Sequence, residues 1–287
     1  MSSPFSVIFC GTPEFAIPCL EALIAAPEFS VDLVITQPDK PVGRKQILTA
    51  PPIKAVAQRH SISVEQPEDI NKFEIRNSKF DFLITVAYGQ IIKDELLEMS
   101  AIAPVNVHPS LLPLLRGASP IQNALLTGDT TTGVTIQRMS AELDAGDILG
   151  QKKVSIEAKE TNETLHNKLA IIAASLLIDT LKNPLKPQAQ DDSKATFCKK
   201  LSREDGVVDP SAMTAQEIDR RVRALTPWPG ITCTINGEDV KIHETSLEST
   251  SSSFPMPCKD GTTLYINKIQ SPGKNVITGN EWALRRK

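Results

Sequence analysis

The strongest constraint on the fold is the alternation of short apolar runs with helical patterns along the first two thirds of the chain. Apolar runs typical of buried strands occupy residues 5–10, 31–36, 80–87, 103–107, 133–138 and 148–154. Helical patterns lie between and after them, at residues 13–23, 53–59, 120–126 and 163–181. Strands that alternate with helices predict an α/β domain whose mainly parallel sheet is covered on both faces.

The pattern changes after residue 182. Residues 183–200 are polar and contain two prolines, which favours a linker. A helix is expected at 215–225, and short strand-like runs follow at 231–235, 240–244 and 263–266, separated by Asn-Gly, Pro and Asp-Gly turns. This spacing predicts a small β-barrel or sandwich. We therefore expect a first domain over residues 1–182, a linker over 183–203 and a second domain over 204–287.

Composition narrows the class of protein. Hydrophobic residues make up 40% of the chain and charged residues 23%, which is typical of a soluble globular protein. No apolar run approaches the roughly 20 residues of a membrane span. The N-terminus lacks the pattern of a secretory signal, so a cytoplasmic protein without a membrane partner is expected. The net charge of -3 argues against a surface that is basic all over, but a local basic stripe stays open.

The five cysteines are scattered and form no Cys-x-x-Cys pair. This distribution indicates neither a disulfide framework nor a zinc site, so reduced thiols and no metal are expected.

Asn106 and His108 follow an apolar strand and stand two residues apart. In an extended chain both side chains point to the same face, and Pro109 keeps His108 out of helical conformation. The carboxyl ends of parallel strands are where α/β folds place their sites. Two interpretations remain open, an acid–base site built on His108 or a pair that satisfies nearby backbone groups.

Asp144 precedes Ala-Gly between two predicted strands. The local sequence favours a turn aspartate. The alternative is a carboxylate that orients His108 and raises its basicity, and nothing local decides between them.

Two loops bear on phosphate binding. The N-terminal turn after the first strand has only Gly11 where dinucleotide-binding folds use three glycines, which disfavours a nicotinamide or flavin enzyme. The loop 37–52 places Lys40, Arg44 and Lys45 close together, either as a phosphate clamp or as a solvated loop. The tail cations Arg220, Arg221 and Arg223 allow the same two interpretations.

Five segments together resemble the methionyl-tRNA formyltransferases over nearly the full chain. They are FCGTPEFA at 9–16, TQPDKPVGR at 36–44, PVNVHPSLLPLLRGASP at 104–120, TGVTIQRMSAELDAGDIL at 132–149 and RALTPWPG at 223–230. The third and fourth are shared by the wider 10-formyltetrahydrofolate superfamily. The second and the Pro-Trp-Pro segment are more particular to the tRNA enzymes.

The resemblance implies a Rossmann-like catalytic domain followed by a small OB-like β-barrel that helps to bind tRNA. It implies that Asn106, His108 and Asp144 are catalytic and that 10-formyltetrahydrofolate is the formyl donor. The acceptor implied is initiator Met-tRNA, and a monomer is expected. The residues expected to line the folate site are Ser110, Leu111, Leu112, Pro113, Tyr88 and Gly89, and those expected at the tRNA are Lys40, Arg44 and Lys45.

Two departures from the family pattern stand out. Asn123 replaces a frequent tryptophan, and Arg44 is followed by Lys45, Gln46 and Ile47 where the family loop commonly continues Arg-Gly-Lys-Lys. The tRNA contact is therefore expected to be weaker at this loop or to use other residues. Rival functions are formyl transfer to an amino-sugar nucleotide, hydrolysis of 10-formyltetrahydrofolate, and a nucleic-acid-binding module without catalysis. The intact Asn106, His108 and Asp144 argue against the last.

Overall fold

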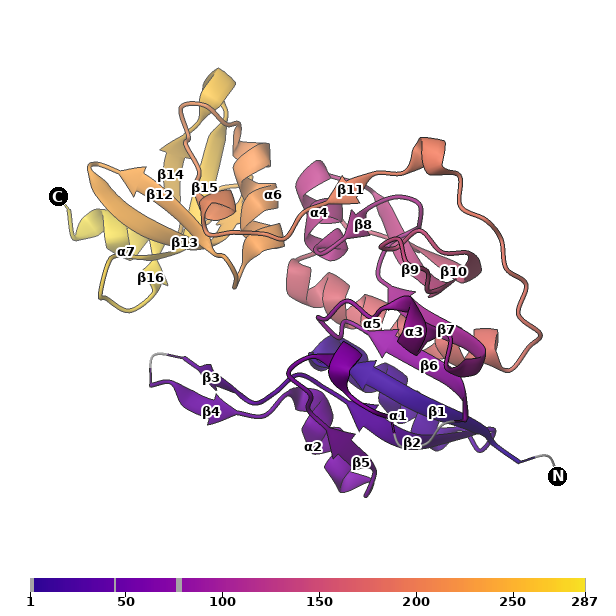
Figure 1. Cartoon of the computed structure of the whole chain (residues 1–287). Helices are drawn as coiled ribbons and strands as arrows, with labels where there is room; N and C mark the ends of the chain where they lie inside the picture. Colours follow the sequence, from indigo (N-terminus) through magenta and orange to yellow (C-terminus); the bar gives the residue numbers. More distant parts are fainter. Residues whose placement is uncertain (1–2, 44, 76–78, 287) are drawn as a thin grey trace. The chain divides into compact units, whose positions relative to one another are not determined.

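A seven-stranded sheet organises the first part of the chain (Figure 1). The computed structural model describes residues 3–43, 45–75 and 79–286. The strands of this sheet are β1 (Phe5–Gly11), β2 (Phe29–Ile35), β5 (Ser63–Glu65), β6 (Phe80–Val86), β7 (Ser100–His108), β9 (Thr131–Arg138) and β10 (Ile148–Ser155). Their order across the sheet is β10-β9-β7-β6-β1-β2-β5.

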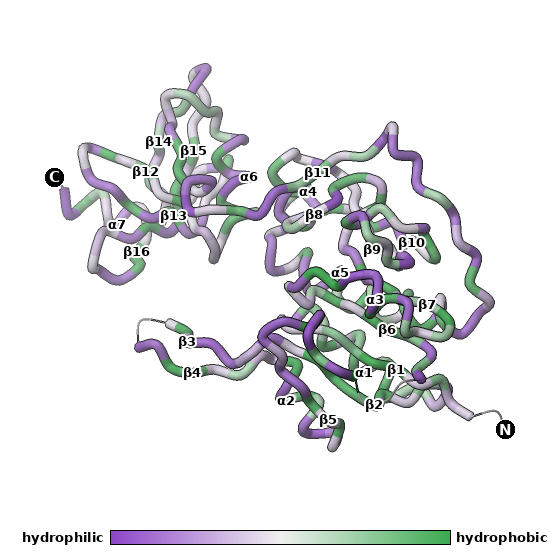
Figure 2. The backbone as a smooth tube through the Cα atoms, viewed as in Figure 1, coloured by the Kyte–Doolittle hydropathy of each residue, from purple (hydrophilic) through white to green (hydrophobic). Residues whose placement is uncertain are grey.

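Most of the sheet is parallel. Strand β1 pairs with β2 on one side and β6 on the other, β2 pairs with β5, and β6 pairs with β7, all in parallel. Strand β9 pairs with β7 in the antiparallel direction. Figure 2 shows β1 and β2 as mainly hydrophobic, as expected for strands that are buried on both faces. The predicted mainly parallel α/β fold is confirmed.

Helices and 3₁₀ turns connect these strands. They are η1 (Glu14–Ala16), α1 (Ile17–Ala25), α2 (Pro52–Arg59), η2 (Ile70–Lys72), α3 (Asp94–Leu97), α4 (Pro120–Thr127), α5 (Asn162–Leu181) and η3 (Asp192–Lys194). The helices α1, α2 and α4 each carry a proline in their first turn, where the missing N–H costs no hydrogen bond.

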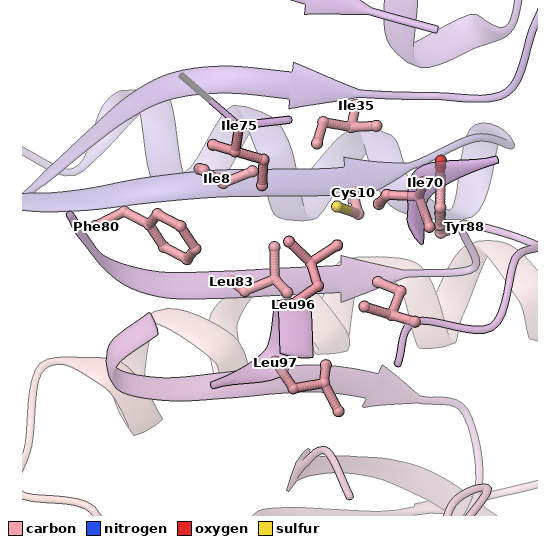
Figure 3. Packing of buried hydrophobic residues seen from close by; sticks show 11 residues of the cluster. Ile8, Cys10, Ile35, Ile70, Ile75, Phe80, Leu83, Tyr88, Leu96 and Leu97 are labelled. Carbon is pink, nitrogen blue, oxygen red and sulfur yellow. The ribbon is translucent and has the colours of Figure 1, made fainter. Parts of the chain in front are cut away.

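An apolar cluster packs residues from strands and helices together. Figure 3 shows Ile8 of β1, Leu83 of β6 and Leu96 of α3 among its members. Cys10 lies in the same cluster as a free thiol, and burial raises its pKa. The five cysteines are free.

Helix α5 is long and apolar enough to cross a membrane by length and composition alone. Leu165, Leu169, Ala173 and Leu177 are fully buried in it at four-residue spacing, which is the pattern of a core helix. Its His166 ring contacts Phe15 with 5.3 Å between ring centroids. The predicted amphipathic helix at 163–181 is therefore confirmed, with a core-facing stripe.

The segment predicted as a long loop at 37–52 contains a short antiparallel hairpin, and this prediction was wrong in part. Strands β3 (Lys40–Val42) and β4 (Ile47–Thr49) pair with each other. Their apolar side chains Val42, Ile47 and Leu48 are exposed, so no buried face marked them as strands in the sequence.

The structure divides into two compact units that interleave along the chain. The first comprises Met1–Gly117, Thr132–Ser155 and His166–Phe197, and the second comprises Ala118–Thr131, Ile156–Leu165 and Cys198–Lys287. The short strands β8 (Arg116–Gly117) and β11 (Phe197–Cys198) pair where the chain passes from one unit to the next. The continuous domain bounds expected from the sequence remain a prediction.

The second unit is built on an antiparallel sheet. Its strands are β12 (Ile231–Ile235), β13 (Glu238–Ser246), β14 (Phe254–Pro257), β15 (Thr263–Gln270) and β16 (Ile277–Thr278). The unit also contains two short 3₁₀ helices, η4 (Glu204–Gly206) and η5 (Lys259–Gly261). Helix α6 (Ala215–Leu225) packs against β13, β15 and α4. Thr214 and Glu217 cap its start reciprocally. A second capping box, Thr278 with Glu281, begins α7 (Gly279–Leu284), which the sequence analysis missed.

Candidate active site

Strand β7 ends by presenting Asn106 and His108, as the two-residue spacing predicts. Its register with β9 sets Asn106 opposite Gln137 and His108 opposite Thr135. The His108 ring is only 4% exposed. Asn106 donates from Nδ2 to Asp144 Oδ1 at 3.3 Å, and His108 Nδ1 lies 3.5 Å from the same oxygen. Both side chains therefore reach one carboxylate.

The Asp144 carboxylate is held from several directions. The backbone N–H of Gly117 donates to Oδ2 at 2.9 Å, and Gln137 donates from Nε2 to Oδ1 at 2.8 Å. Asp144 itself has a φ of 55°, a conformation that aspartate tolerates better than most residues. The structure thus brings together the three residues predicted as catalytic, and their roles remain a prediction.

The second nitrogen of His108 is also occupied. Its Nε2 lies 2.9 Å from the carbonyl oxygen of Leu115. A carbonyl oxygen only accepts, so Nε2 carries a proton in this arrangement. Nδ1 then faces the Asp144 carboxylate, at a distance that is loose for a hydrogen bond. A ring protonated on both nitrogens can donate to both partners, which suits a group that takes up and releases a proton.

Residues 110–113 form a braced segment beside His108. Thr135 donates its hydroxyl to the carbonyl of Ser110 at 2.7 Å and accepts the N–H of Leu112 at 3.1 Å. Gln151 donates to the Leu112 carbonyl at 3.0 Å. The Ser110 hydroxyl is fully buried and donates to the Leu114 carbonyl. Leu111 and Pro113 are half-buried, so a ligand could contact their side chains without unfolding the segment.

Tyr88 and Gly89 follow β6 at the same carboxyl edge of the sheet. The Tyr88 ring packs in the apolar cluster with Cys10 and Ile70 (Figure 3), and burial raises the pKa of its hydroxyl. Its carbonyl accepts the hydroxyl of Thr12 at 2.7 Å. Gly89 is exposed with a φ of 92°. A ligand at this edge would therefore meet backbone of Gly89 rather than the Tyr88 ring.

Two of the three predicted tRNA-binding residues, Lys40 and Lys45, lie on the β3–β4 hairpin. Lys40 is exposed, with Nζ 3.4 Å from Oε1 of Gln37, and Lys45 is exposed in the turn. Arg44 lies outside the described residues. The tail cations differ from these, because Arg221 donates to the Asp205 carbonyl and Arg223 donates to Asp219 and to the Glu160 carbonyl. These bonds favour a structural role for Arg221 and Arg223.

Three residues of the site were missed in the sequence. Gln137 could have been suspected because it is a polar side chain within a mainly buried strand. Arg116 follows an apolar segment and carries a charge that a solvated turn would accommodate, yet its side chain is buried. Gln190 carried no signal, because it lies in a polar segment expected to be a linker.

Within residues 3–43, 45–75 and 79–286, no group of three or more His, Cys, Asp or Glu side chains is arranged to hold a metal ion.

Family models match both parts of the chain. A model described as formyl transferase matches residues 5–181, and one described as formyl transferase, C-terminal domain, matches residues 200–257. The chain is similar to a methionyl-tRNA formyltransferase of Bacillus subtilis, with 40% identity over 286 residues, covering 97% of this chain and 87% of the relative.

Solved structures agree on the fold. An N-formyltransferase from Helicobacter canadensis, in complex with folinic acid and dTDP-3-aminofucose, is similar with a TM-score of 0.69 at 18% identity, covering 92% of this chain and 98% of the other. A methionyl-tRNA formyltransferase from Clostridium thermocellum has a TM-score of 0.58 at 16% identity, covering 96% and 98%. The resemblance inferred from the sequence is confirmed: this chain belongs to the methionyl-tRNA formyltransferases of the formyl transferase family.

Proposed function

We propose that this chain transfers the formyl group of 10-formyltetrahydrofolate to the α-amino group of methionine on initiator tRNA, for translation initiation. The observation that carries the proposal is the cluster at the carboxyl end of β7, where Asn106 and His108 both reach the Asp144 carboxylate. Family membership supports both the folate donor and the tRNA-bound acceptor.

The residues around the cluster fit such a donor. Ser110–Pro113 is a rigid, partly apolar wall, and Gly89 offers backbone without a side chain. Beside Asp144, the buried Oε1 of Gln137 has no hydrogen-bond partner among the residues that the structure describes. This oxygen is a hydrogen-bond acceptor, so it could bind an N–H group of a ligand. When bound, the donor supplies an already activated formyl group.

Formyl transfer needs an oxyanion donor and a route for one proton. The bond between the methionine nitrogen and the formyl carbon forms, the bond from that carbon to N10 breaks, and one proton moves from the amine to N10. An α-amino group has a pKa of about 8, so a useful fraction is neutral near pH 7. The Asn106 side chain can donate an N–H to the developing oxyanion, and losing one such donor typically costs about 2.7–4 kcal/mol.

His108 is the candidate proton carrier. Asp144 orients its ring through Nδ1 and would stabilise the imidazolium that forms when the ring accepts a proton. The Nε2–H bond to the Leu115 carbonyl fixes the ring from the other side. General acid–base help of this kind typically accelerates a reaction about a hundred- to ten-thousand-fold.

The protein would bind the acceptor, Met-tRNA, mainly through the phosphates of the tRNA. Lys40 and Lys45 on the exposed hairpin, with Arg44 between them in sequence, would contact the acceptor end of the tRNA. Residues 204–287 would contribute further tRNA contacts as a separate domain behind the linker 183–203. We further propose a monomer that acts in the cytoplasm.

The test is formylation of charged initiator tRNA by the purified protein with saturating 10-formyltetrahydrofolate, followed as formyl-methionine on the tRNA. We expect transfer by the wild-type protein and a loss of kcat of at least about a hundredfold in His108→Ala. His60→Ala removes an exposed imidazole outside the site and should match the wild type. A kcat near the wild-type value in His108→Ala would refute the role of this residue.

A further inference from the structure

The segment between the two family matches is attached to the candidate active site. Figure 1 shows this segment running from the end of α5 to β11 in a mainly extended path, and Figure 2 shows it as largely hydrophilic. Its composition predicts a passive linker. However, the backbone of Gln188 exchanges two hydrogen bonds with Ile148 of β10, at 2.8 and 2.9 Å. Two residues later, the Gln190 side chain turns toward Asp144.

Gln190 holds the backbone on both sides of Ala145. Its Nε2 donates to the carbonyl of Asp144 at 2.9 Å and to the carbonyl of Gly146 at 2.7 Å. Both hydrogens of the side-chain amide are therefore used on the turn that carries the Asp144 carboxylate.

The other end of the amide is held by Arg116. Its Nε and Nη2 donate to Gln190 Oε1 at 3.1 and 2.8 Å. Arg116 is 2% exposed, and its Nη2 also donates to Asp192 at 2.6 Å. A guanidinium only donates and the two carbonyls only accept, so both sets of partners demand the same orientation of the amide. The bonds of Gln190 are thus mutually consistent.

The turn that Gln190 holds needs external support. Asp144 occupies a positive φ, which costs energy for a residue with a side chain. A Cβ at Gly146 would clash with the Arg138 carbonyl, so this backbone passes very close to β9. Such a turn keeps its shape only when its surroundings determine it. A small rotation of the backbone would move the carboxylate away from Asn106 and His108.

We propose that Gln190 is a positioning residue for catalysis: it holds the Asp144 turn through the two carbonyls and is itself held by Arg116. The inference rests on the proposed function, because it presupposes that the Asp144 carboxylate acts on His108. It assigns residues of the linker to the active-site structure. Gln190 touches no reacting atom in this account, and it acts only through Asp144.

Three variants test the proposal. Gln190→Leu removes both sets of bonds. Gln190→Glu keeps an acceptor for Arg116, but its carboxylate beside that guanidinium has no N–H for the two carbonyls. Gln188→Leu changes an exposed side chain of the same type in the same segment and leaves its backbone pairing intact.

Kinetics and amide exchange are measured for each variant. We expect Gln190→Leu and Gln190→Glu to lower kcat about ten- to a hundredfold, with KM for donor and acceptor within about twofold of the wild type. Amide hydrogen exchange should become faster in a peptide covering residues 140–147 in both variants. Gln188→Leu should behave as the wild type in both measurements.

The exchange measurement does not depend on the acceptor. If the wild type does not formylate Met-tRNA, the proposed function fails, while exchange at 140–147 still decides whether Gln190 holds the turn. Unchanged exchange or a wild-type kcat in both Gln190 variants would overturn the positioning role. A loss confined to KM, or an equal loss in Gln188→Leu, would overturn it as well.

Discussion

At the residue scale, the candidate site is centred on the Asp144 carboxylate, which accepts more hydrogen bonds than an aspartate in an ordinary turn. Asp144 receives the N–H of Gly117 on one oxygen and the amides of Gln137 and Asn106 on the other. These donors fix the direction of the carboxylate. Local sequence favoured an ordinary turn residue, and the surrounding geometry favours the alternative in which Asp144 orients His108.

Replacing this carboxylate tests whether its charge matters beyond its shape. Asp144→Asn keeps the size of the side chain, but its amide would place a donor against Gly117 N–H or Gln137. We expect kcat for formyl transfer to fall about a hundred- to ten-thousand-fold while the folded protein persists. Glu142→Gln removes an exposed carboxylate two residues earlier and serves as the control. A kcat within tenfold of the wild type in Asp144→Asn would rule out an acid–base role.

Sequence patterns could place two site residues together only where the local backbone conformation fixes their relative positions. Asn106 and His108 could be paired because strand alternation alone puts them on one face. Asp144 could be considered as a partner of His108, but only the family resemblance favoured that role, since 36 positions separate the two residues and no periodicity connects them. Gln190 lies in a polar segment, and its hydrogen bonds depend on where that segment passes the turn that carries Asp144. Long-range contacts of this kind leave no local pattern.

At the element scale, strands and helices with a buried face were predictable and those without one were not. Helix α6 has the predicted bounds, and β7 was predicted as 103–107 but begins at Ser100. Strand β5 has three residues, too few for a pattern, and the β3–β4 hairpin exposes both of its faces. The hairpin therefore depends on the pairing of its own two strands.

The hairpin lysines should act on tRNA rather than on the donor. Replacing Lys40 and Lys45 together by alanine removes two exposed charges. We expect a higher KM for Met-tRNA, an unchanged KM for 10-formyltetrahydrofolate and a salt dependence of the KM that is less steep by about one per lysine. Lys93→Ala with Lys153→Ala removes two exposed charges elsewhere as the control. An unchanged KM for Met-tRNA would exclude the hairpin as a phosphate contact.

At the scale of the whole molecule, the change of pattern after residue 182 correctly predicted an α/β part followed by an antiparallel β part. The interleaving of the two compact units was not predictable, because α4 lies early in the chain but packs on α6. The net charge of -3 means that any attraction for RNA is local. The proposed tRNA contact therefore depends on local cations such as those of the β3–β4 hairpin.

Competition between several acceptors for the formyl group decides whether Met-tRNA is the substrate. The protein is given 10-formyltetrahydrofolate with charged initiator tRNA, an amino-sugar nucleotide and water, and the formyl group is traced to each product. We expect the formyl group to appear on methionine, in a transfer that requires His108. Formate release or a formylated sugar amine, with Met-tRNA left unmodified, would contradict it.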